Sequence, residues 1–239
     1  MEPEVKIFPD ATAVAKAFAD DFANWVNQSS KSTLTVALSG GTTPKLLFSI
    51  WAEQFADKLD WSRLHFFWGD ERCVPPTDGE SNFKAAKTLF LDKVSVPASN
   101  IHRVIGEADP GGERLRYENE ICTVVEVDDN GMPRFDKFIL GLGDDGHTAS
   151  IFPHESEFLM SDRICEVATH PTSGQKRITL TGPVINMARS VDFLVTGAGK
   201  AIVLPQVVYH KGDYESFPAS HIRATIVTFY VDEAAAKNL

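Results

Sequence analysis

The apolar residues of this chain follow two alternating patterns, one helical and one strand-like. After Asp10, apolar residues recur every three or four positions, which predicts an amphipathic helix whose first turn Asp10 caps. A second helical pattern opens at Pro44 and a third near Ser81. Between the helical patterns lie short continuous apolar runs, typical of strands covered on both faces: 34–38, 64–68, 138–140, 178–181, 192–196 and 225–230.

This alternation of strands and helices predicts an α/β layered fold with a mostly parallel central sheet flanked by helices. Ligands in such folds bind beyond the carboxyl ends of the strands. Three of the predicted strands end in polar loops that contain glycine, so we expect the chemistry there. Further candidate loops, none long enough to mark a domain boundary, are 75–80, 108–112 and 128–133. We therefore expect one domain over residues 1–239.

The composition narrows the class of protein. The chain has 239 residues, with 23 Lys and Arg against 33 Asp and Glu, and a formal net charge of −10. This acidic balance disfavours a nucleic-acid surface or a polybasic membrane anchor, because both need an excess of Lys and Arg. The sequence shows no signal-peptide pattern and no apolar run long enough to span a bilayer. We therefore expect a cytoplasmic monomer or weak homodimer with no nucleic-acid or membrane partner.

Cysteine and histidine spacing disfavours a metal centre. The three cysteines, Cys73, Cys122 and Cys165, form no C-x-x-C pair and are too few for a disulfide framework. His147 and His154 lie seven residues apart, outside any H-E-x-x-H motif. We therefore expect a reduced protein without a catalytic metal.

The first candidate loop follows the strand at 34–38 and opens a helix. Its glycines allow a ligand to approach the backbone closely, and the free N–H groups of the helix start favour a phosphate. The residues expected there are Ser39, Gly40, Gly41 and Thr42. The Walker A spacing is absent, and Ala37–Gly41 approximates a nucleophile elbow, which leaves a serine nucleophile as one alternative and an ordinary turn as another.

Two further loops offer cations. Gly69-Asp70-Glu71-Arg72 ends the strand at 64–68, and Arg72 can bind a phosphate through two parallel hydrogen bonds, with Asp70 or Glu71 placed to orient it. Lys200 ends the turn after the strand at 192–196 and is a candidate for a second phosphate cation. Taken alone, each also fits a surface residue, Arg72 in a salt bridge and Lys200 in solvent.

The most informative stretch is Gly141–Ser150, with the sequence GLGDDGHTAS. Its glycines fit G-x-G-x-x-G, but its acidic residues stand where a pyrophosphate needs bare N–H groups, and Pro153 curtails any helix opened there. A histidine beside a carboxylate in a glycine-flanked loop instead favours a general base. The candidates are His147 as the base, Asp145 as the residue that orients it, and Gly143 as a backbone contact.

Together these motifs resemble those of the 6-phosphogluconolactonases, within the glucosamine-6-phosphate isomerase/6-phosphogluconolactonase family. The matching blocks follow the family's order: Ser39–Pro44, Asp70–Pro75 with Ser81-Asn82, Gly141–Pro153, Arg177–Pro183, Thr196–Ala201 and Val231–Ala235. Two departures stand out. Ile151 replaces the more usual Leu, and Gly111–Tyr117 is less rich in Ala than the family's helix there, which leaves the start of that helix open.

The resemblance implies a Rossmann-like fold with a small appended element, as in glucosamine-6-phosphate deaminase and ribose-5-phosphate isomerase. It implies hydrolysis of 6-phospho-D-glucono-1,5-lactone to 6-phosphogluconate, a step of the pentose phosphate pathway, without metal or organic cofactor. The family's base maps onto His147, and its phosphate-binding arginine and lysine onto Arg72 and Lys200.

Three other functions compete with this one. A sugar-phosphate deaminase on the same fold carries Ile after the Gly-His pair and Glu five residues beyond the histidine, whereas this chain has Thr148 and Phe152. A non-enzymatic sugar-phosphate sensor would carry a helix-turn-helix domain, for which the residues before 34 leave no room. A serine hydrolase would depend on Ser39. Whether Arg177 and His221 reach the site stays open at this point.

Overall fold

The larger of two sheets forms the centre of the molecule. The computed structural model describes residues 2–239, and its larger sheet has seven strands in the order β1-β10-β9-β6-β2-β3-β5, with every neighbouring pair parallel. These strands are β1 (Glu4–Phe8), β2 (Leu34–Leu38), β3 (Leu64–Trp68), β5 (Ile101–His102), β6 (Lys137–Leu140), β9 (Val191–Val195) and β10 (Val227–Asp232).

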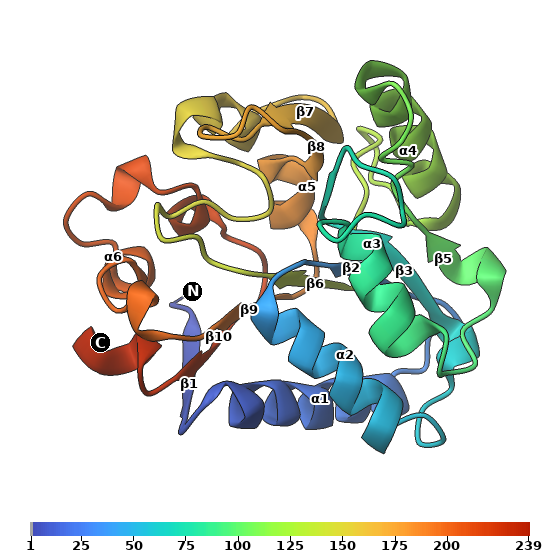
Figure 1. Ribbon diagram of the computed structural model, residues 1–239, viewed down its shortest axis with the longest axis horizontal. Coiled ribbons are helices and arrows are strands. Elements are labelled where there is room, and N and C mark those ends of the chain that lie inside the picture. Colours follow the sequence, from blue (N-terminus) through green and yellow to red (C-terminus); the bar gives the residue numbers. More distant parts are fainter. Residues whose placement is uncertain (1) are drawn as a thin grey trace.

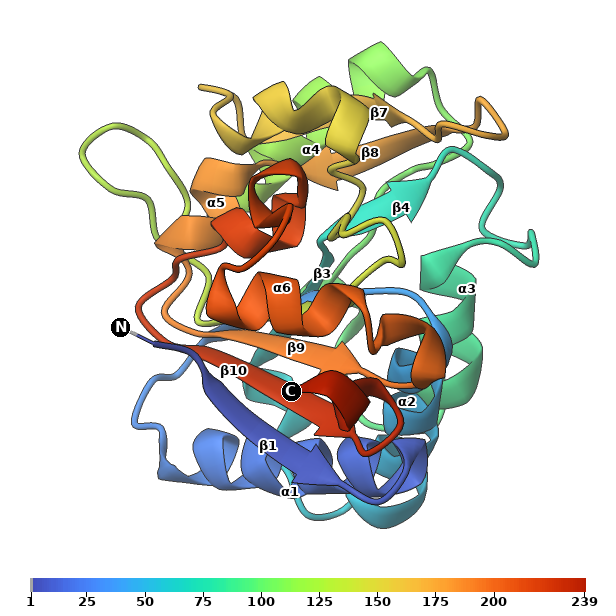
Figure 2. The ribbon, with the colours of Figure 1, turned by 90° about the vertical axis from the view of Figure 1, so that its left-hand side faces the viewer.

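Helices cover this sheet on both faces. Helices α1 (Ala11–Gln28) and α2 (Thr42–Gln54) pack against one another along one face (Figure 1). Helix α6 (Val203–Tyr209) lies on the other side of β9 and β10 from α1 (Figure 2). The remaining helices are α3 (Asn82–Ala86), α4 (Pro110–Val124) and α5 (Gly182–Met187). This is the layered α/β arrangement that the hydrophobic pattern predicts.

The smaller sheet is the appended element. It consists of β4 (Asp70–Arg72), β8 (Lys176–Leu180) and β7 (Cys165–Thr169), all antiparallel, in the order β4-β8-β7. It stands above the larger sheet in both ribbon views, and α4 packs against β7 and β8 (Figures 1 and 2). The predicted strand at 178–181 therefore belongs to this sheet.

An aromatic cluster fills the space between the larger sheet and its helices. Trp51 of α2 is fully buried, and its ring lies 4.6 Å from Phe22 of α1 and 5.2 Å from Phe90, centroid to centroid. Fully burying a side chain of this size contributes about 1.5–3 kcal/mol or more. This cluster fixes α2, and with it the loop before α2, against the sheet.

Most of the predicted elements are present, and the differences have local causes. Strands β2 and β3 have the predicted bounds, and the Asp10 carboxylate accepts the hydrogen bond of Ala13 N at the start of α1. Helix α2 begins two residues before Pro44. The helix predicted near Ser81 is short, because after Ala86 it continues as a π-helical turn to Leu91.

Two predicted loops are regular structure instead. The prediction of a loop at 108–112 is wrong, because α4 begins at Pro110. The Asp109 carboxylate caps this helix by accepting a hydrogen bond from Gly112 N at 2.9 Å. Helix α4 was hard to predict, since its surface is held by ion pairs such as Arg114–Glu118 rather than by a strong apolar stripe. Residues 70–72 form β4. Polar residues interrupt the apolar runs of β1 (EVKIF) and β7 (CEVAT), and β5 has only two residues, so none of the three shows a clear strand pattern.

Gly69 is the single residue between the two sheets. It separates β3 of the larger sheet from β4 of the smaller one, and its N–H donates to Leu38 O at 2.8 Å while its carbonyl accepts from Leu180 N at 2.8 Å. A Cβ atom at this position would lie 2.6 Å from Phe138 Cε1, and Phe138 is fully buried. The junction of the two sheets therefore has room only for glycine.

Substituting Gly69 by alanine tests this junction. We expect Gly69→Ala to lower the free energy of unfolding by about 1–3 kcal/mol, because the added methyl group overpacks the core against Phe138. Gly79→Ala is the matched control, since no atom lies within 4 Å of a Cβ at Gly79. Urea unfolding measures both variants. Equal stability of the two variants would contradict the account.

Candidate active site

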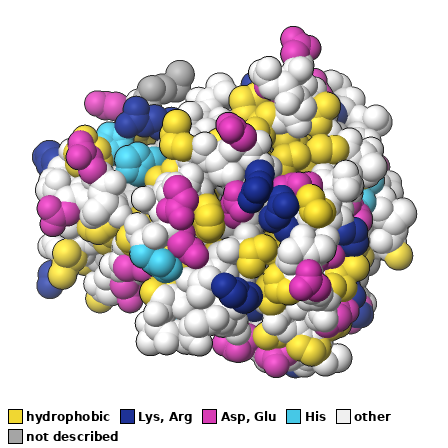
Figure 3. All heavy atoms as spheres, turned by 90° about the horizontal axis from the view of Figure 1, so that it is seen from above, with side chains coloured by type: hydrophobic (Ala, Val, Ile, Leu, Met, Phe, Trp, Pro, Cys, Tyr) yellow, Lys and Arg dark blue, Asp and Glu magenta, His cyan; other side chains and the backbone are white. Residues whose placement is uncertain are grey.

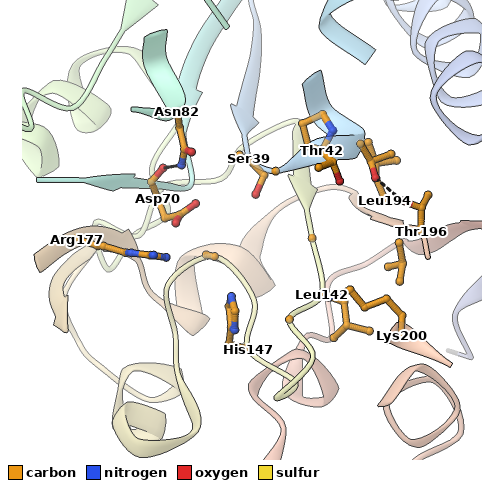
Figure 4. A pocket seen from close by; sticks show the side chains of 18 of the residues that line it. Ser39, Thr42, Asp70, Asn82, Leu142, His147, Arg177, Leu194, Thr196 and Lys200 are labelled. Carbon is orange, nitrogen blue, oxygen red and sulfur yellow. Dashed lines mark hydrogen bonds between the residues drawn. The ribbon is translucent and has the colours of Figure 1, made fainter. Parts of the chain in front are cut away.

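A cavity of about 250 Å³ lies at the carboxyl ends of β2, β3, β6 and β9, facing the smaller sheet (Figure 4). The predicted residues that line it are Ser39, Gly40, Gly41, Thr42, Asp70, Arg72, Gly143, His147 and Lys200. Asp145 does not line the cavity itself but contacts His147. The carboxyl ends of the parallel strands therefore bring together loops that are far apart in the sequence.

The start of α2 forms one wall of the cavity. Gly41 occupies the position before the helix, where no side chain accepts a hydrogen bond from the first turn, so the N–H groups of Thr42 and Thr43 lack an intrahelical partner. These groups and the helix dipole favour an anion. The Thr43 hydroxyl lies 2.7 Å from the Thr196 hydroxyl, which ties the helix start to the end of β9.

A second wall comes from β4 and the start of α3. Asn82 Nδ2 donates to Asp70 O at 2.9 Å, and the Asn82 amide occupies the space that a Cβ on Gly40 would fill, 2.0 Å from Asn82 Oδ1. Behind this wall, the buried Glu71 carboxylate accepts hydrogen bonds from Ser81 Oγ and from three backbone N–H groups. Burial raises the pKa of Glu71, and these hydrogen bonds oppose that rise. Glu71 is therefore a structural residue that holds Arg72 in place.

His147 and Asp145 form a hydrogen-bonded pair on the loop after β6. His147 Nδ1 lies 2.5 Å from Asp145 Oδ1, and Asp145 Oδ1 also accepts from His147 N at 3.2 Å. Among residues 2–239, Nε2 of His147 has no hydrogen-bond partner, and the imidazole lines the cavity. A carboxylate that accepts from Nδ1–H fixes the tautomer in which Nε2 carries the lone pair, so the arrangement can accept a proton from a ligand or water.

Gly143 and Phe152 hold the imidazole from two sides. A Cβ at Gly143 would lie 2.1 Å from His147 Nδ1, so only glycine leaves space for the ring. The Phe152 ring, nearly fully buried, lies 4.9 Å from the imidazole, centroid to centroid. The carboxylate, the glycine and the ring together leave the imidazole with one orientation.

Lys200 reaches the cavity but has a partner. Its Nζ lies 2.5 Å from Asp144 Oδ1, an ion pair that joins the histidine loop to the turn after β9. That turn is itself fixed by Asp232, whose two carboxylate oxygens both lie 3.0 Å from Gly197 N. The terminal Val231–Ala235 block thus supports the site from outside the cavity. To bind a phosphate, Lys200 would have to give up its ion pair with Asp144.

The structure also settles the residues that the sequence left open. Arg177 of β8 lines the cavity, with a side chain that points toward Asp70 and His147 (Figure 4). His221 lies outside, with Nε2 2.9 Å from Glu215 O. The polar lining residues that sequence reasoning did not assign are Thr43, Asn82, Arg177 and Thr196, and each stands inside a motif block.

The alternatives find less support in this geometry. Ser39 Oγ forms no hydrogen bond with a histidine within residues 2–239, so the pair that would activate a serine nucleophile is not assembled. In the described part of the chain no three His, Cys, Asp or Glu side chains gather as a metal site. Within the same residues no helix is both long and apolar enough to cross a membrane.

Acidic side chains are scattered over the face of the molecule that Figure 3 shows, with Lys and Arg side chains among them. Three of the cations, Arg72, Arg177 and Lys200, line the cavity, with Asp70 as the acidic side chain among its lining residues. The net charge of −10 therefore coexists with a cavity suited to an anion.

Comparison with known proteins places these features in a family. Residues 9–230 match the family model described as glucosamine-6-phosphate isomerases/6-phosphogluconolactonase. The chain is 40% identical over 235 residues to a 6-phosphogluconolactonase of Haemophilus influenzae, covering 97% of this chain and 98% of that relative.

Solved structures agree with this match. The structure of 6-phosphogluconolactonase from Trypanosoma brucei superposes with a TM-score of 0.89 at 26% identity, covering 100% of this chain and 99% of that one. A monomeric glucosamine-6-phosphate deaminase superposes with a TM-score of 0.82 at 20% identity, covering 99% and 100%. The likeness to the deaminase shows a shared fold alone.

The pKa of Asp145 reports directly on the histidine pair. Burial raises this pKa, but the hydrogen bonds and charge of His147 outweigh it and lower the pKa to about 2. The pair therefore stabilises the fold above the ordinary carboxyl pKa, and that stabilisation is lost as the pH falls toward 2.

We expect ¹³C NMR titration of the Asp145 carboxyl to give a pKa of about 2 in the unmodified chain. His147→Ala should return the pKa toward the ordinary value of about 4. His154→Ala removes a neighbouring histidine that has no contact with Asp145 and should leave the pKa low. A pKa near 4 in the unmodified chain would show that the pair does not form.

Proposed function

The chain belongs to the glucosamine-6-phosphate isomerase/6-phosphogluconolactonase family, and we propose that its cavity hydrolyses 6-phospho-D-glucono-1,5-lactone to 6-phospho-D-gluconate. The observation that carries the proposal is the Asp145–His147 pair, held with Nε2 free at the wall of an anion-binding cavity. Hydrolysis of a phosphorylated lactone requires a base at one point of the cavity and ligands for the phosphate at another.

The phosphate ligands come from two elements on one side of the cavity. In the proposal, the N–H groups at the start of α2 and the Arg72 guanidinium bind the phosphate, and Lys200 approaches from the turn after β9. Ser39, Gly40, Gly41 and Thr42 shape the loop that allows the phosphate to approach. Fixing the phosphate also fixes the lactone ring relative to His147, which makes the reaction effectively unimolecular.

His147 acts as the general base. Its Nε2 removes a proton from water as the water oxygen bonds to C1 of the lactone, and the C1 carbonyl becomes an oxyanion. When the tetrahedral intermediate collapses, the C1–ring oxygen bond breaks and the ring oxygen takes the proton from the imidazolium. Asp145 stabilises the imidazolium in between. The lactone is an activated ester, so the reaction needs no covalent intermediate on the chain.

Backbone N–H groups of the glycine-containing loops stabilise the oxyanion in this proposal. One preorganised donor of this kind contributes roughly 2.7–4 kcal/mol to the transition state. Gly143 lines the cavity on the same loop as the base, and its own N–H donates to His147 O at 2.8 Å. Its role is therefore to hold the loop, and the donors to the oxyanion come from its neighbours.

Phe152 supports hydrolysis over deamination. It occupies the position five residues after His147, where the deaminases carry a glutamate that assists ring opening. Here the position holds an apolar ring that is 1% exposed and packs on the imidazole. No carboxylate stands at this point to exchange a proton with a ring oxygen. An assay of ammonia release from glucosamine 6-phosphate should accordingly show no activity.

Removing the base should abolish most of the catalysis. We expect His147→Ala to reduce kcat by about 10²–10⁴-fold, the usual contribution of general base catalysis, and to leave binding of 6-phosphogluconate unchanged. His221→Ala, which removes a histidine outside the cavity, is the control and should keep full activity. A coupled assay measures turnover after subtraction of spontaneous lactone opening. An undiminished kcat in His147→Ala would refute the assignment.

Removing the arginine should weaken substrate binding instead. We expect Arg72→Ala to raise KM by about 10- to 100-fold with a smaller effect on kcat, because a charge-assisted hydrogen bond contributes roughly 1.5–3 kcal/mol. Arg163→Ala is the matched control, since Arg163 is exposed and pairs with Glu166 outside the cavity. Steady-state kinetics at saturating and limiting lactone separate the two constants. An unchanged KM would remove Arg72 from the phosphate site.

A further inference from the structure

Asp144 is an acidic residue beside the cavity that the proposed mechanism does not use. The loop after β6 carries two neighbouring aspartates, of which Asp145 contacts the imidazole of His147. Asp144 instead reaches another element, because its Oδ1 lies 2.5 Å from Nζ of Lys200, 56 residues further along the chain. The two neighbouring carboxylates therefore contact different groups of the cavity.

The two ends of this ion pair differ in their contact with solvent. The Lys200 side chain is 22% exposed and lines the cavity, whereas the Asp144 side chain is 76% exposed and is not among the lining residues. The carboxylate is thus largely hydrated even while the pair is closed. It can rotate away into water at a small cost, while the ammonium group stays at the cavity.

A second lysine–aspartate pair of the chain shows the contrast. Lys137 Nζ lies the same 2.5 Å from Asp192 Oδ2, but these two side chains are only 10% and 4% exposed. Separating two buried partners would leave a desolvated charge without compensation, so we expect that pair to stay closed. The Lys200–Asp144 pair has the same length without this constraint, which makes it an exchangeable contact.

The backbone on both sides of the exchangeable pair is held in place. On one side, Gly143 N donates to His147 O at 2.8 Å and closes the loop that carries the aspartate. On the other side, both oxygens of the Asp232 carboxylate lie 3.0 Å from Gly197 N and fix the turn that carries the lysine. The pair can therefore open by rotation of its two side chains, without movement of the loop or the turn.

A phosphate ester in the cavity competes with the carboxylate for the ammonium group of Lys200. The phosphate dianion carries the larger charge, so it can displace the carboxylate, but it binds only to the fraction of the chain in which the pair is open. The apparent affinity for a ligand falls with the fraction of the protein that is competent to bind it. A closed pair therefore weakens phosphate binding at this point of the cavity.

We propose that Asp144 is an internal counterion of Lys200, which the phosphate displaces on binding and which weakens the affinity of the cavity for phosphate esters. This inference rests on the proposed function and deepens it. When the phosphate leaves, the carboxylate returns to the ammonium group, so the cation has an anion beside it before and after each turnover. The chain thereby gives up part of its affinity for the product, 6-phosphogluconate, which has to leave before the next turnover.

The test measures the Kd of 6-phosphogluconate by calorimetric titration. Asp144→Asn removes the charge and keeps the shape of the side chain, and we expect it to lower the Kd about three- to fivefold, the upper range for an exposed ion pair. Asp144→Glu retains a carboxylate and should keep the Kd of the unmodified chain. Asp129→Asn is the matched control, since Asp129 is exposed and does not line the cavity.

A double-mutant cycle with Lys200→Gln separates the counterion from simple repulsion. Lys200→Gln should raise the Kd by itself, and Asp144→Asn added to it should cause no further change, because the carboxylate then has no ammonium group to occupy. An equal gain in both backgrounds would overturn the inference, since Asp144 would then repel the ligand directly rather than act through Lys200.

Two other results would also overturn it. An unchanged Kd in Asp144→Asn would show that the pair does not compete with the ligand, and a raised Kd would show that Asp144 supports the turn. Lactone hydrolysis is measured separately on the unmodified chain. If the chain bound 6-phosphogluconate without hydrolysing the lactone, the proposed function would fail, and the cycle of Kd values would still decide the role of Asp144.

Discussion

The cavity depends on the passage of the chain from one sheet to the other within a single residue. Gly69 leaves β3 of the parallel sheet and enters β4 of the antiparallel one, and its backbone is hydrogen-bonded on both sides. Because the turn is this short, Arg72 stands only a few residues from the carboxyl end of β3. A longer connection would carry the smaller sheet away from the strand ends where the histidine loop lies.

The same junction explains how an acidic chain presents a positive cavity. The net charge describes the whole surface, whereas the binding of an anion depends on a few groups that are shielded from water. Here the desolvated cations are the two arginines of β4 and β8, while Lys200 and His147 each have a carboxylate beside them. The two carboxylates have different partners, since Asp145 contacts the His147 imidazole, the proposed base, and Asp144 contacts the Lys200 ammonium group.

Much of the fold and of the site could be predicted from local sequence. The runs at 34–38 and 64–68 are apolar except for Thr35 and His65, so their strands were predictable to the residue, and glycine-containing loops at strand ends pointed to His147 and Arg72. Arg177 could not be assigned in this way. Its place in the cavity follows from pairing β8 with β4, two segments about a hundred residues apart, and no periodicity within either segment records that register. The pairing of Lys200 with Asp144 is hidden for the same reason.

The central claim is the orientation of the substrate, with its phosphate at Arg72 and the start of α2 and its C1 atom at His147. A crystal structure of the chain with bound 6-phosphogluconate tests this orientation most directly. The account predicts phosphate oxygens within hydrogen-bond distance of Arg72 and of the N–H groups at the start of α2, and the C1 carboxylate beside His147 Nε2. A complex with the phosphate beside His147 and the carboxylate at Arg72 would contradict it.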